Sequence, residues 1–254
     1  MFILVIDGDT HITVSQKGIK IEELIKRMEK AKVDSSITWL QPVYRTEEEL
    51  LDGNRYVYEA MKKYPGKIFG FGWVDPNFGV DKSKDLVKKL VYDYGFYGVK
   101  LNGAQNNFYI DDPENSLPIV ETLVKTGKIL AFHIGGDACD RTHPFRLARV
   151  AQKFPEAKIL MVHMGGAAFN DLSYAAIEVA ENYHNIISIG SAIRDISILN
   201  ALKTIGSKRI CFGSDTPFAL MHVEVAKYQA LLSDFSEDDR QNVMAGNLIE
   251  LLKL

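Results

Sequence analysis

The sequence has few cysteines and no long apolar run. Cys139 and Cys211 are its two cysteines, and they lie too far apart for a metal-ligand pair or a disulfide scaffold. No stretch reaches the ~20 apolar residues of a membrane span, and the apolar run at residues 2–6 is too short for the core of a signal peptide. We therefore expect an unprocessed cytoplasmic protein in reducing surroundings, without a membrane partner.

The chain also lacks an excess of positive charge. It has 30 basic and 33 acidic residues, a formal net charge of −3, so binding to nucleic acid or to acidic lipid is disfavoured. Its 254 residues are 46% apolar and 25% charged, which is typical of a soluble globular protein and excludes a disordered or fibrous chain. A self-sufficient core is expected.

Short apolar runs alternate with amphipathic helical stretches along the whole chain. The predicted strands are 2–7, 36–40, 68–74, 98–102, 129–134, 158–163, 186–190 and 209–213. The predicted helices are 21–31, 47–63, 83–94, 114–126, 144–154, 171–183 and 196–205, with two more over 219–232 and 236–252. Eight such units without a linker predict an α/β fold, a single-domain (β/α)₈ TIM barrel over residues 1–254 with an extra C-terminal helix.

Catalytic groups of a barrel lie at the C-terminal ends of its strands. Strands one, five, six and eight each finish with an imidazole or a carboxylate. Asp9 and His11 are two residues apart and point to the same side of a strand, so both can face the mouth. With His133 and Asp215 they would form a site for one divalent ion with a position open for water. Such a centre is typical of hydrolases and lyases.

Five segments carry a resemblance to a known family. They are Ile6-Asp-Gly-Asp-Thr-His11, Gly98-Val-Lys-Leu101, Phe132-His-Ile-Gly135, His163-Met-Gly-Gly166 and Gly213-Ser-Asp-Thr-Pro217. In this order and on these strands, they resemble the amidohydrolase-related (amidohydrolase 2) branch of the metal-dependent amidohydrolase superfamily, which includes hydrolases, decarboxylases and hydratases. The resemblance covers nearly the whole chain.

The resemblance implies a role for each polar strand end. His11, His133 and Asp215 match metal ligands, and His163 matches the catalytic histidine beside the metal-bound water. Asp9 departs from the pattern, because most members carry a histidine there, whereas some decarboxylating members carry a carboxylate. A richer set of oxygen ligands shifts the preferred ion from zinc toward manganese or magnesium.

Three cations are candidate substrate-binding residues. Lys100 alternates with two apolar residues on the fourth strand, so it faces the barrel interior, where a buried ammonium needs a partner. A bridging metal ligand, as in two-metal members of the superfamily, is the alternative for this lysine. Arg194 and Arg141 follow strands seven and five and can bind a carboxylate in bidentate fashion, with a solvated loop position as the alternative.

The leading hypothesis is a metal-dependent hydrolase of a small ester, lactone or amide. In this hypothesis Asp215 takes the proton of the bound water, and His163 polarises the carbonyl or passes the proton to the leaving group. The alternative is a decarboxylase, or another carbon–carbon lyase, of a small unsaturated or aromatic acid. A third reading is a barrel that only binds a small molecule. One ion, zinc or manganese, and a carboxylate-bearing substrate are expected, and the exposed barrel helices leave a homodimer open.

Overall fold

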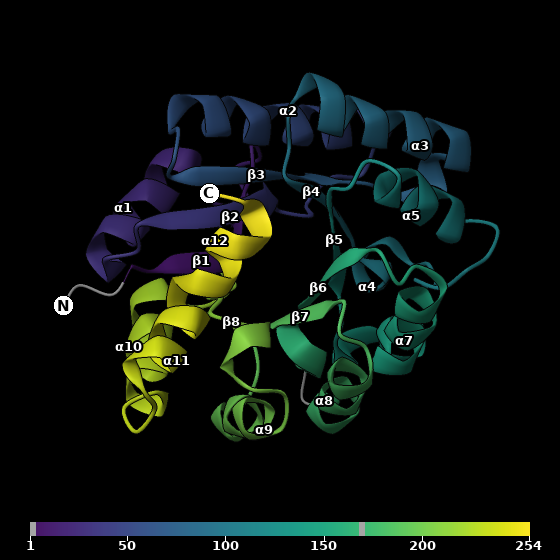
Figure 1. Ribbon diagram of the computed structural model, residues 1–254. Coiled ribbons are helices and arrows are strands. Elements are labelled where there is room, and N and C mark those ends of the chain that lie inside the picture. Colours follow the sequence, from purple (N-terminus) through teal and green to yellow (C-terminus); the bar gives the residue numbers. More distant parts are fainter. Residues whose placement is uncertain (1–3, 168–170) are drawn as a thin grey trace.

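The computed structural model describes residues 4–167 and 171–254. In this part of the chain the eight strands form one parallel sheet in the order β1 to β8, with helices on its outer side (Figure 1). The strands are β1 (Ile6–Ile12), β2 (Ser35–Leu40), β3 (Ile68–Trp73), β4 (Gly98–Leu101), β5 (Ile129–His133), β6 (Lys158–Val162), β7 (Ile186–Ile189) and β8 (Ile210–Cys211). The predicted (β/α)₈ barrel is confirmed.

The helices follow the strands in the predicted alternation. Up to the eighth strand they are α1 (Ile21–Ala31), α2 (Glu47–Lys63), α3 (Val80–Lys88), α4 (Gly103–Asn106), α5 (Leu117–Val124), α6 (Cys139–Thr142), α7 (Pro144–Lys153), α8 (Ser173–Asn182) and α9 (Asp195–Ile205). The first two have the predicted bounds. α2 begins where the hydroxyl of Thr46 accepts the backbone N–H of Glu49 at 3.2 Å, and acidic residues in its first turn favour the helix dipole.

The first strand begins and ends later than predicted. It covers Ile6–Ile12 rather than 2–7, and residues 2–3 of the prediction lie outside the described residues. The polar residues taken for a strand end pair with β2, His11 opposite Trp39 and Thr10 opposite Thr38. The backbones of these residues pair with β2, and the N–H of His11 bonds the carbonyl of Thr216 at 2.8 Å, so their polarity does not end the strand.

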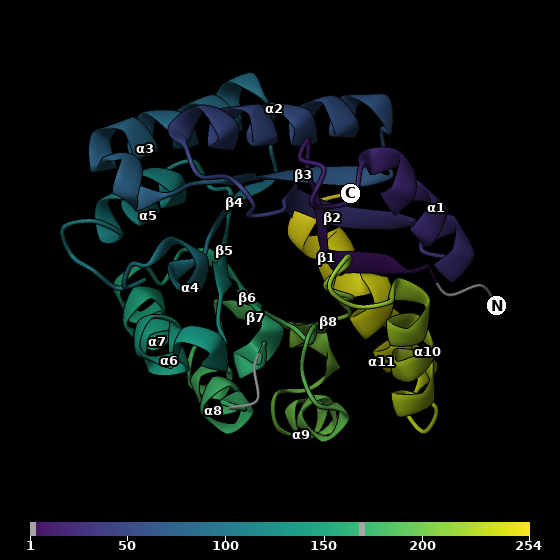
Figure 2. The same cartoon turned by 180° about the vertical axis from the view of Figure 1, so that it is seen from behind.

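The last strand is shorter than predicted, and the C-terminal helix is divided. β8 ends at Cys211, because the next N–H, that of Phe212, bonds the carbonyl of Val243 at 2.9 Å. After α10 (Met221–Leu231), the predicted helix 236–252 consists of α11 (Glu237–Gln241), a π-helical turn and α12 (Asn247–Leu252). This segment lies against β8 and β1, and α10 packs beside α1 (Figures 1 and 2). None of the described helices is both long and apolar enough to cross a membrane.

Candidate metal centre

Three predicted ligands lie together at the mouth of the barrel. Asp9 and His11 come from β1, and Asp215 comes from the loop after β8. Nε2 of His11 is 3.4 Å from Oδ1 of Asp9 and 3.5 Å from Oδ1 of Asp215. One ligand atom from each of the three residues lies within 4.8 Å of the others, which suits a single divalent ion.

The His11 ring is oriented by two neighbours. Nδ1 faces the carbonyl of Leu40 at 3.2 Å, and Nε2 accepts the indole N–H of Trp39 at 3.0 Å. The neutral ring therefore carries its hydrogen on Nδ1, and its single lone pair on Nε2 accepts the indole N–H of Trp39, so a metal ion bound at Nε2 would replace that hydrogen bond. Burial and the charge of Lys100 oppose a second proton, but the neighbouring carboxylates of Asp215 and Asp9 outweigh them and raise the pKa of His11. The space beside Nε2 thus attracts positive charge.

The two oxygens of Asp9 have different surroundings. Oδ2 accepts the hydroxyl hydrogen of Ser191 at 2.5 Å. Oδ1 is buried and accepts no hydrogen bond from the described residues, although the ammonium of Lys100 lies 3.6 Å away. Burial opposes ionisation, but the charges of Lys100 and the two nearest histidines lower the pKa of Asp9 well below its usual range. An ionised oxygen without a hydrogen-bond donor fits a metal ligand.

His163 is connected to Asp9 through a serine. Its Nδ1 lies 3.0 Å from Oγ of Ser191, whose own hydrogen goes to Asp9, so the ring donates from Nδ1 and keeps the lone pair on Nε2. Burial lowers the pKa of His163 to about 4, so the ring is neutral near pH 7. The histidine has φ 70°, a strained backbone conformation that is common at functional sites.

The structure places His133 apart from the three clustered ligands. Its Nε2 lies 2.9 and 3.1 Å from the two carboxylate oxygens of Asp137, and its ring packs edge-on against His163 at 4.6 Å between centroids. His133 is thus held at the mouth beside the catalytic candidate, and its role as a metal ligand stays a prediction.

Of the three candidate substrate cations, Lys100 lies at the metal cluster. It is 1% exposed, and its ammonium stands 3.8 Å from the ring centre of Trp39. Burial lowers the pKa of Lys100, although Asp9 opposes the shift. Arg194 is 67% exposed and bonds Asp171 at 3.0 Å, and Arg141 contacts Asn107 and lies 3.8 Å from Asp140. The two arginines are rim residues with partners of their own.

Four residues of the site were missed by the sequence analysis. They are Ser191, which bridges Asp9 and His163, Trp39, which donates to His11, Asp137, which pairs with His133, and Asp7, which accepts the N–H of Asp9. Ser191 lies two residues after the end of β7, so its position near a strand end was a signal that could have been used. The other three act through partners that only the folded chain reveals.

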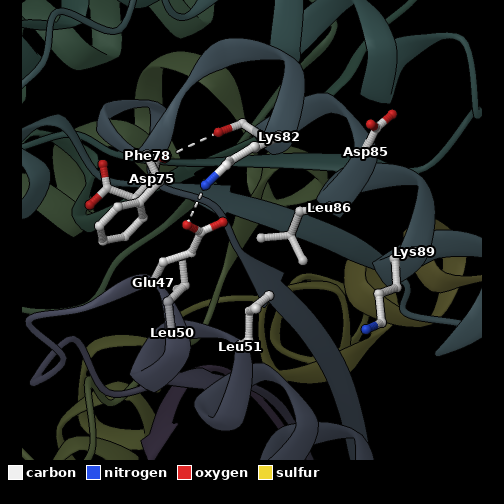
Figure 3. Close-up of a pocket in the computed structure, with 10 residues that line it drawn as sticks. Glu47, Leu50, Leu51, Asp75, Phe78, Lys82, Asp85, Leu86 and Lys89 are labelled. Atoms are coloured by element: carbon white, nitrogen blue, oxygen red, sulfur yellow. Dashed lines mark hydrogen bonds and ion pairs between the residues drawn. The ribbon is translucent and has the colours of Figure 1, made fainter.

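A cavity of about 320 Å³ lies elsewhere, between α2 and α3 (Figure 3). Leu50, Leu51 and Leu86 line it, and Glu47 and Lys82 form an ion pair of 2.7 Å beside it. None of the predicted site residues lines this cavity. It belongs to the outer helical layer, and the polar cluster at the barrel mouth is the better candidate for chemistry.

Known proteins share the sequence pattern and the fold. The Amidohydrolase family model matches residues 26–254. A 2-amino-3-carboxymuconate-6-semialdehyde decarboxylase of Dictyostelium discoideum is 22% identical over 93% of this chain and 76% of its own length. The fold is similar to that of a 2,6-dihydroxybenzoate decarboxylase from Rhizobium, with a TM-score of 0.78, 18% identity and 99% of each chain covered. It is also similar to a dihydroxybenzoic acid decarboxylase from a Polaromonas species, solved with manganese and 2-nitroresorcinol, with a TM-score of 0.77, 19% identity and coverage of 100% and 98%.

These comparisons correct the leading functional hypothesis. The expected hydrolase of an ester, lactone or amide is wrong, because the relative matched in sequence over 93% of this chain is a decarboxylase, as are the two similar structures named above. The hypothesis followed from the usual use of a metal-activated water, and the same ligands serve either reaction. The carboxylate at Asp9 was the feature that favoured the alternative.

Proposed function

We propose that this chain, which belongs to the amidohydrolase family, is a metal-dependent decarboxylase of a small aromatic or unsaturated carboxylic acid. The observation that carries the proposal is the group of Asp9, His11 and Asp215 at the mouth of a barrel whose matched relative is a decarboxylase. The geometrically similar decarboxylases act in the same fold. The substrate class follows from the acids that these relatives are named for.

Asp9, His11 and Asp215 would hold the ion, and His133 is the predicted fourth ligand. Two carboxylates and one imidazole make an oxygen-rich set, which suits manganese better than zinc. A bound divalent ion supplies a Lewis-acid charge that binds oxygen atoms of the substrate and stabilises negative charge on them. The buried, unbonded Oδ1 of Asp9 supports this assignment.

His163 is the proposed proton-transfer residue. In the reaction the bond between a carbon and the carboxylate breaks, carbon dioxide leaves, and the electron pair that stays on the carbon takes up a proton. His163 takes up a proton from solvent at Nε2, delivers it to that carbon and returns to the neutral ring. Ser191 accepts the Nδ1 hydrogen and donates to Asp9, so the negative charge of Asp9 stabilises the ring while it carries the second proton.

Three cations are proposed to attract the acid substrate, one inside the barrel, Lys100, and two on its rim, Arg141 and Arg194. Lys100 is buried between Asp9 and two tryptophan rings, so its ammonium provides fixed positive charge beside the reacting carboxylate. The two arginines on the rim attract the anion before it enters. Trp39 and Trp73 give the mouth an aromatic wall next to His11, at ring distances of 5.8 and 6.3 Å.

The test combines metal analysis with a substrate screen. Protein purified without added metal is chelated, reloaded with manganese and incubated with dihydroxybenzoates and with carboxylated muconate semialdehydes, and the release of carbon dioxide is measured. We expect about one ion per chain and activity that disappears on chelation and returns with the ion. Asp215→Ala should lose both metal and activity.

His184→Ala is the matched control, because this histidine is exposed in the loop before β7. It should keep the metal and the activity. Metal retention in Asp215→Ala equal to that of the unaltered protein would show that the site is wrongly assigned. Tight metal binding with no carbon dioxide released from any acid of either class would contradict the decarboxylase proposal and favour a barrel that only binds small molecules.

A further inference from the structure

The two chain segments that carry the metal ligands meet where the barrel closes. Strands β1 to β8 are joined in order by parallel ladders, whereas β8 has only two residues. The seam between β8 and β1 depends on separate backbone bonds, from the N–H of Gly8 to Phe212 at 3.0 Å and from that of His11 to Thr216 at 2.8 Å. β1 also shifts its register against β2 between Asp7 and Thr10. The seam is therefore the irregular part of the barrel.

One side-chain oxygen bridges this seam between the two backbone bonds. Oδ1 of Asp7 accepts the backbone N–H of Asp9 at 3.0 Å and that of Ser214 at 2.9 Å. Asp7 is 0% exposed. The two donors are far apart in the sequence, and each would be a buried N–H without a partner if this oxygen were removed. Asp7 thus replaces a rung of the ladder that β1 and β8 do not form.

We propose that Asp7 is the positioning residue of the metal site, setting the spacing between Asp9 and Asp215 by holding the backbone of both segments on one oxygen. The inference rests on the proposed function, because it concerns the same site. Ser214 directly precedes Asp215, whose φ is 56°, a conformation that a residue with a side chain keeps only when its surroundings fix it. Fixing the Ser214 N–H fixes the start of that turn.

The role requires an acceptor at Oδ1 rather than a negative charge. An amide oxygen at the same place accepts the same two N–H groups, so Asp7→Asn should preserve the site. Asp7→Ala removes the acceptor, frees the two ligand segments from each other and should weaken manganese binding. Loss of a group that orients metal ligands typically lowers affinity by about 10- to 100-fold.

Calorimetric titration with manganese, combined with the electron paramagnetic resonance spectrum of bound manganese, tests the proposal. We expect Asp7→Ala to bind about 10- to 100-fold more weakly with an altered spectrum, and Asp7→Asn to bind within about threefold of the unaltered protein with the same spectrum. If Asp7→Ala does not fold, the manganese affinity and spectrum of Asp7→Asn alone test the proposal. A folded Asp7→Asn with more than tenfold weaker binding would overturn the proposal, because charge would then be the requirement.

Asn247→Ala is the matched control for loss of stability. Its buried amide donates to the carbonyls of Ser207 and Ile210 at 2.7 and 2.8 Å, at the opposite end of β8 from the metal ligands. This variant should unfold at a lower temperature yet bind manganese as the unaltered protein does. Equal weakening in both alanine variants would mean that general loosening explains the effect, and Asp7 has no positioning role. If the unaltered protein binds no manganese, the proposed metal site itself is wrong.

Discussion

Replacing Lys100 with Met should destabilise the metal-free protein and strengthen its binding of manganese. The ammonium lies 3.6 Å from Oδ1 of Asp9, and both side chains are buried. At an effective dielectric constant of about 20 this separation corresponds to an interaction of about 4 to 5 kcal/mol. Met keeps the length and apolar contacts of the stem against Trp39 but leaves the Asp9 carboxylate without its cation. We expect the free energy of unfolding in chelator to fall by about 3 to 5 kcal/mol.

The metal affinity should change in the opposite direction. Lys100 competes with a cation for Oδ1 of Asp9 and repels an ion held there. If removal of the ammonium makes the free energy of manganese binding more favourable by only a third of the interaction energy, about 1.5 kcal/mol, manganese binds roughly tenfold more tightly. Saturating manganese should therefore stabilise Lys100→Met more than it stabilises the unaltered protein.

Urea unfolding with chelator and with excess manganese measures the first effect, and calorimetric titration measures the second. Lys82→Met is the control, because this lysine forms an ion pair of 2.7 Å with Glu47 but is 65% exposed. It should change stability by less than about 1 kcal/mol and leave manganese affinity unchanged. Weaker manganese binding in Lys100→Met, or metal-free stability equal to that of the unaltered protein, would show that the ammonium does not act on Asp9 in this way.

Three further predictions follow from the described contacts. His163→Asn should retain its metal but turn over about 10²- to 10⁴-fold more slowly in a carbon dioxide release assay, and unchanged turnover would remove the histidine from the proton-transfer role. Asp9→His should raise the affinity for zinc relative to manganese in a competition titration, because it replaces an oxygen ligand with imidazole; an unchanged ratio would mean that Asp9 does not bind the ion directly. Asp111→Asn should lower stability by about 1 kcal/mol at pH 7, because Asp111 pairs with Arg146 and Arg149 at 2.7 and 2.8 Å. Burial opposes ionisation, but the two arginines outweigh it and lower the pKa of Asp111, so its stabilisation is present above the unfolded pKa of about 4 and is lost as the pH falls through the folded value. Urea unfolding at pH 7 and pH 3 should show the difference between the two proteins shrinking at the lower pH, and a constant difference would contradict the ion-pair explanation.

The sequence alone was sufficient for the fold class and for most element positions. Periodicity is a local property, so α1 and α2 could be predicted to the residue. The first strand was misplaced because Asp9 and His11 are polar, and a local reading takes polar residues for the end of a strand. His11 belongs to the strand because its backbone pairs with Trp39 of β2, and Asp9 lies at the register shift just before the paired residue Thr10. Both placements depend on a neighbouring strand.

The candidate site was predictable as a set of residue types but not as a set of contacts. Because catalytic groups of a barrel lie at the C-terminal ends of its strands, the sequence predicted that Asp9, His11 and Asp215 share one mouth. The structure places their ligand atoms together. The sequence could not indicate that the nearest partner of His133 is Asp137, or that Ser191 connects Asp9 to His163. These contacts depend on the conformations of the loops that follow the strands.

The barrel and the chemical identity of its polar strand ends could thus be read from the sequence, because the periods of strands and helices and the types of residue are local properties of the chain. The contacts between those groups, in contrast, depend on how distant segments of the chain come together in the folded barrel. Oδ1 of Asp7 accepts the N–H of Asp9 and that of Ser214, which lies 207 residues after Asp7, and the ammonium of Lys100 faces Asp9 from another strand. Closing the barrel creates these distances, and no local pattern in the sequence contains them.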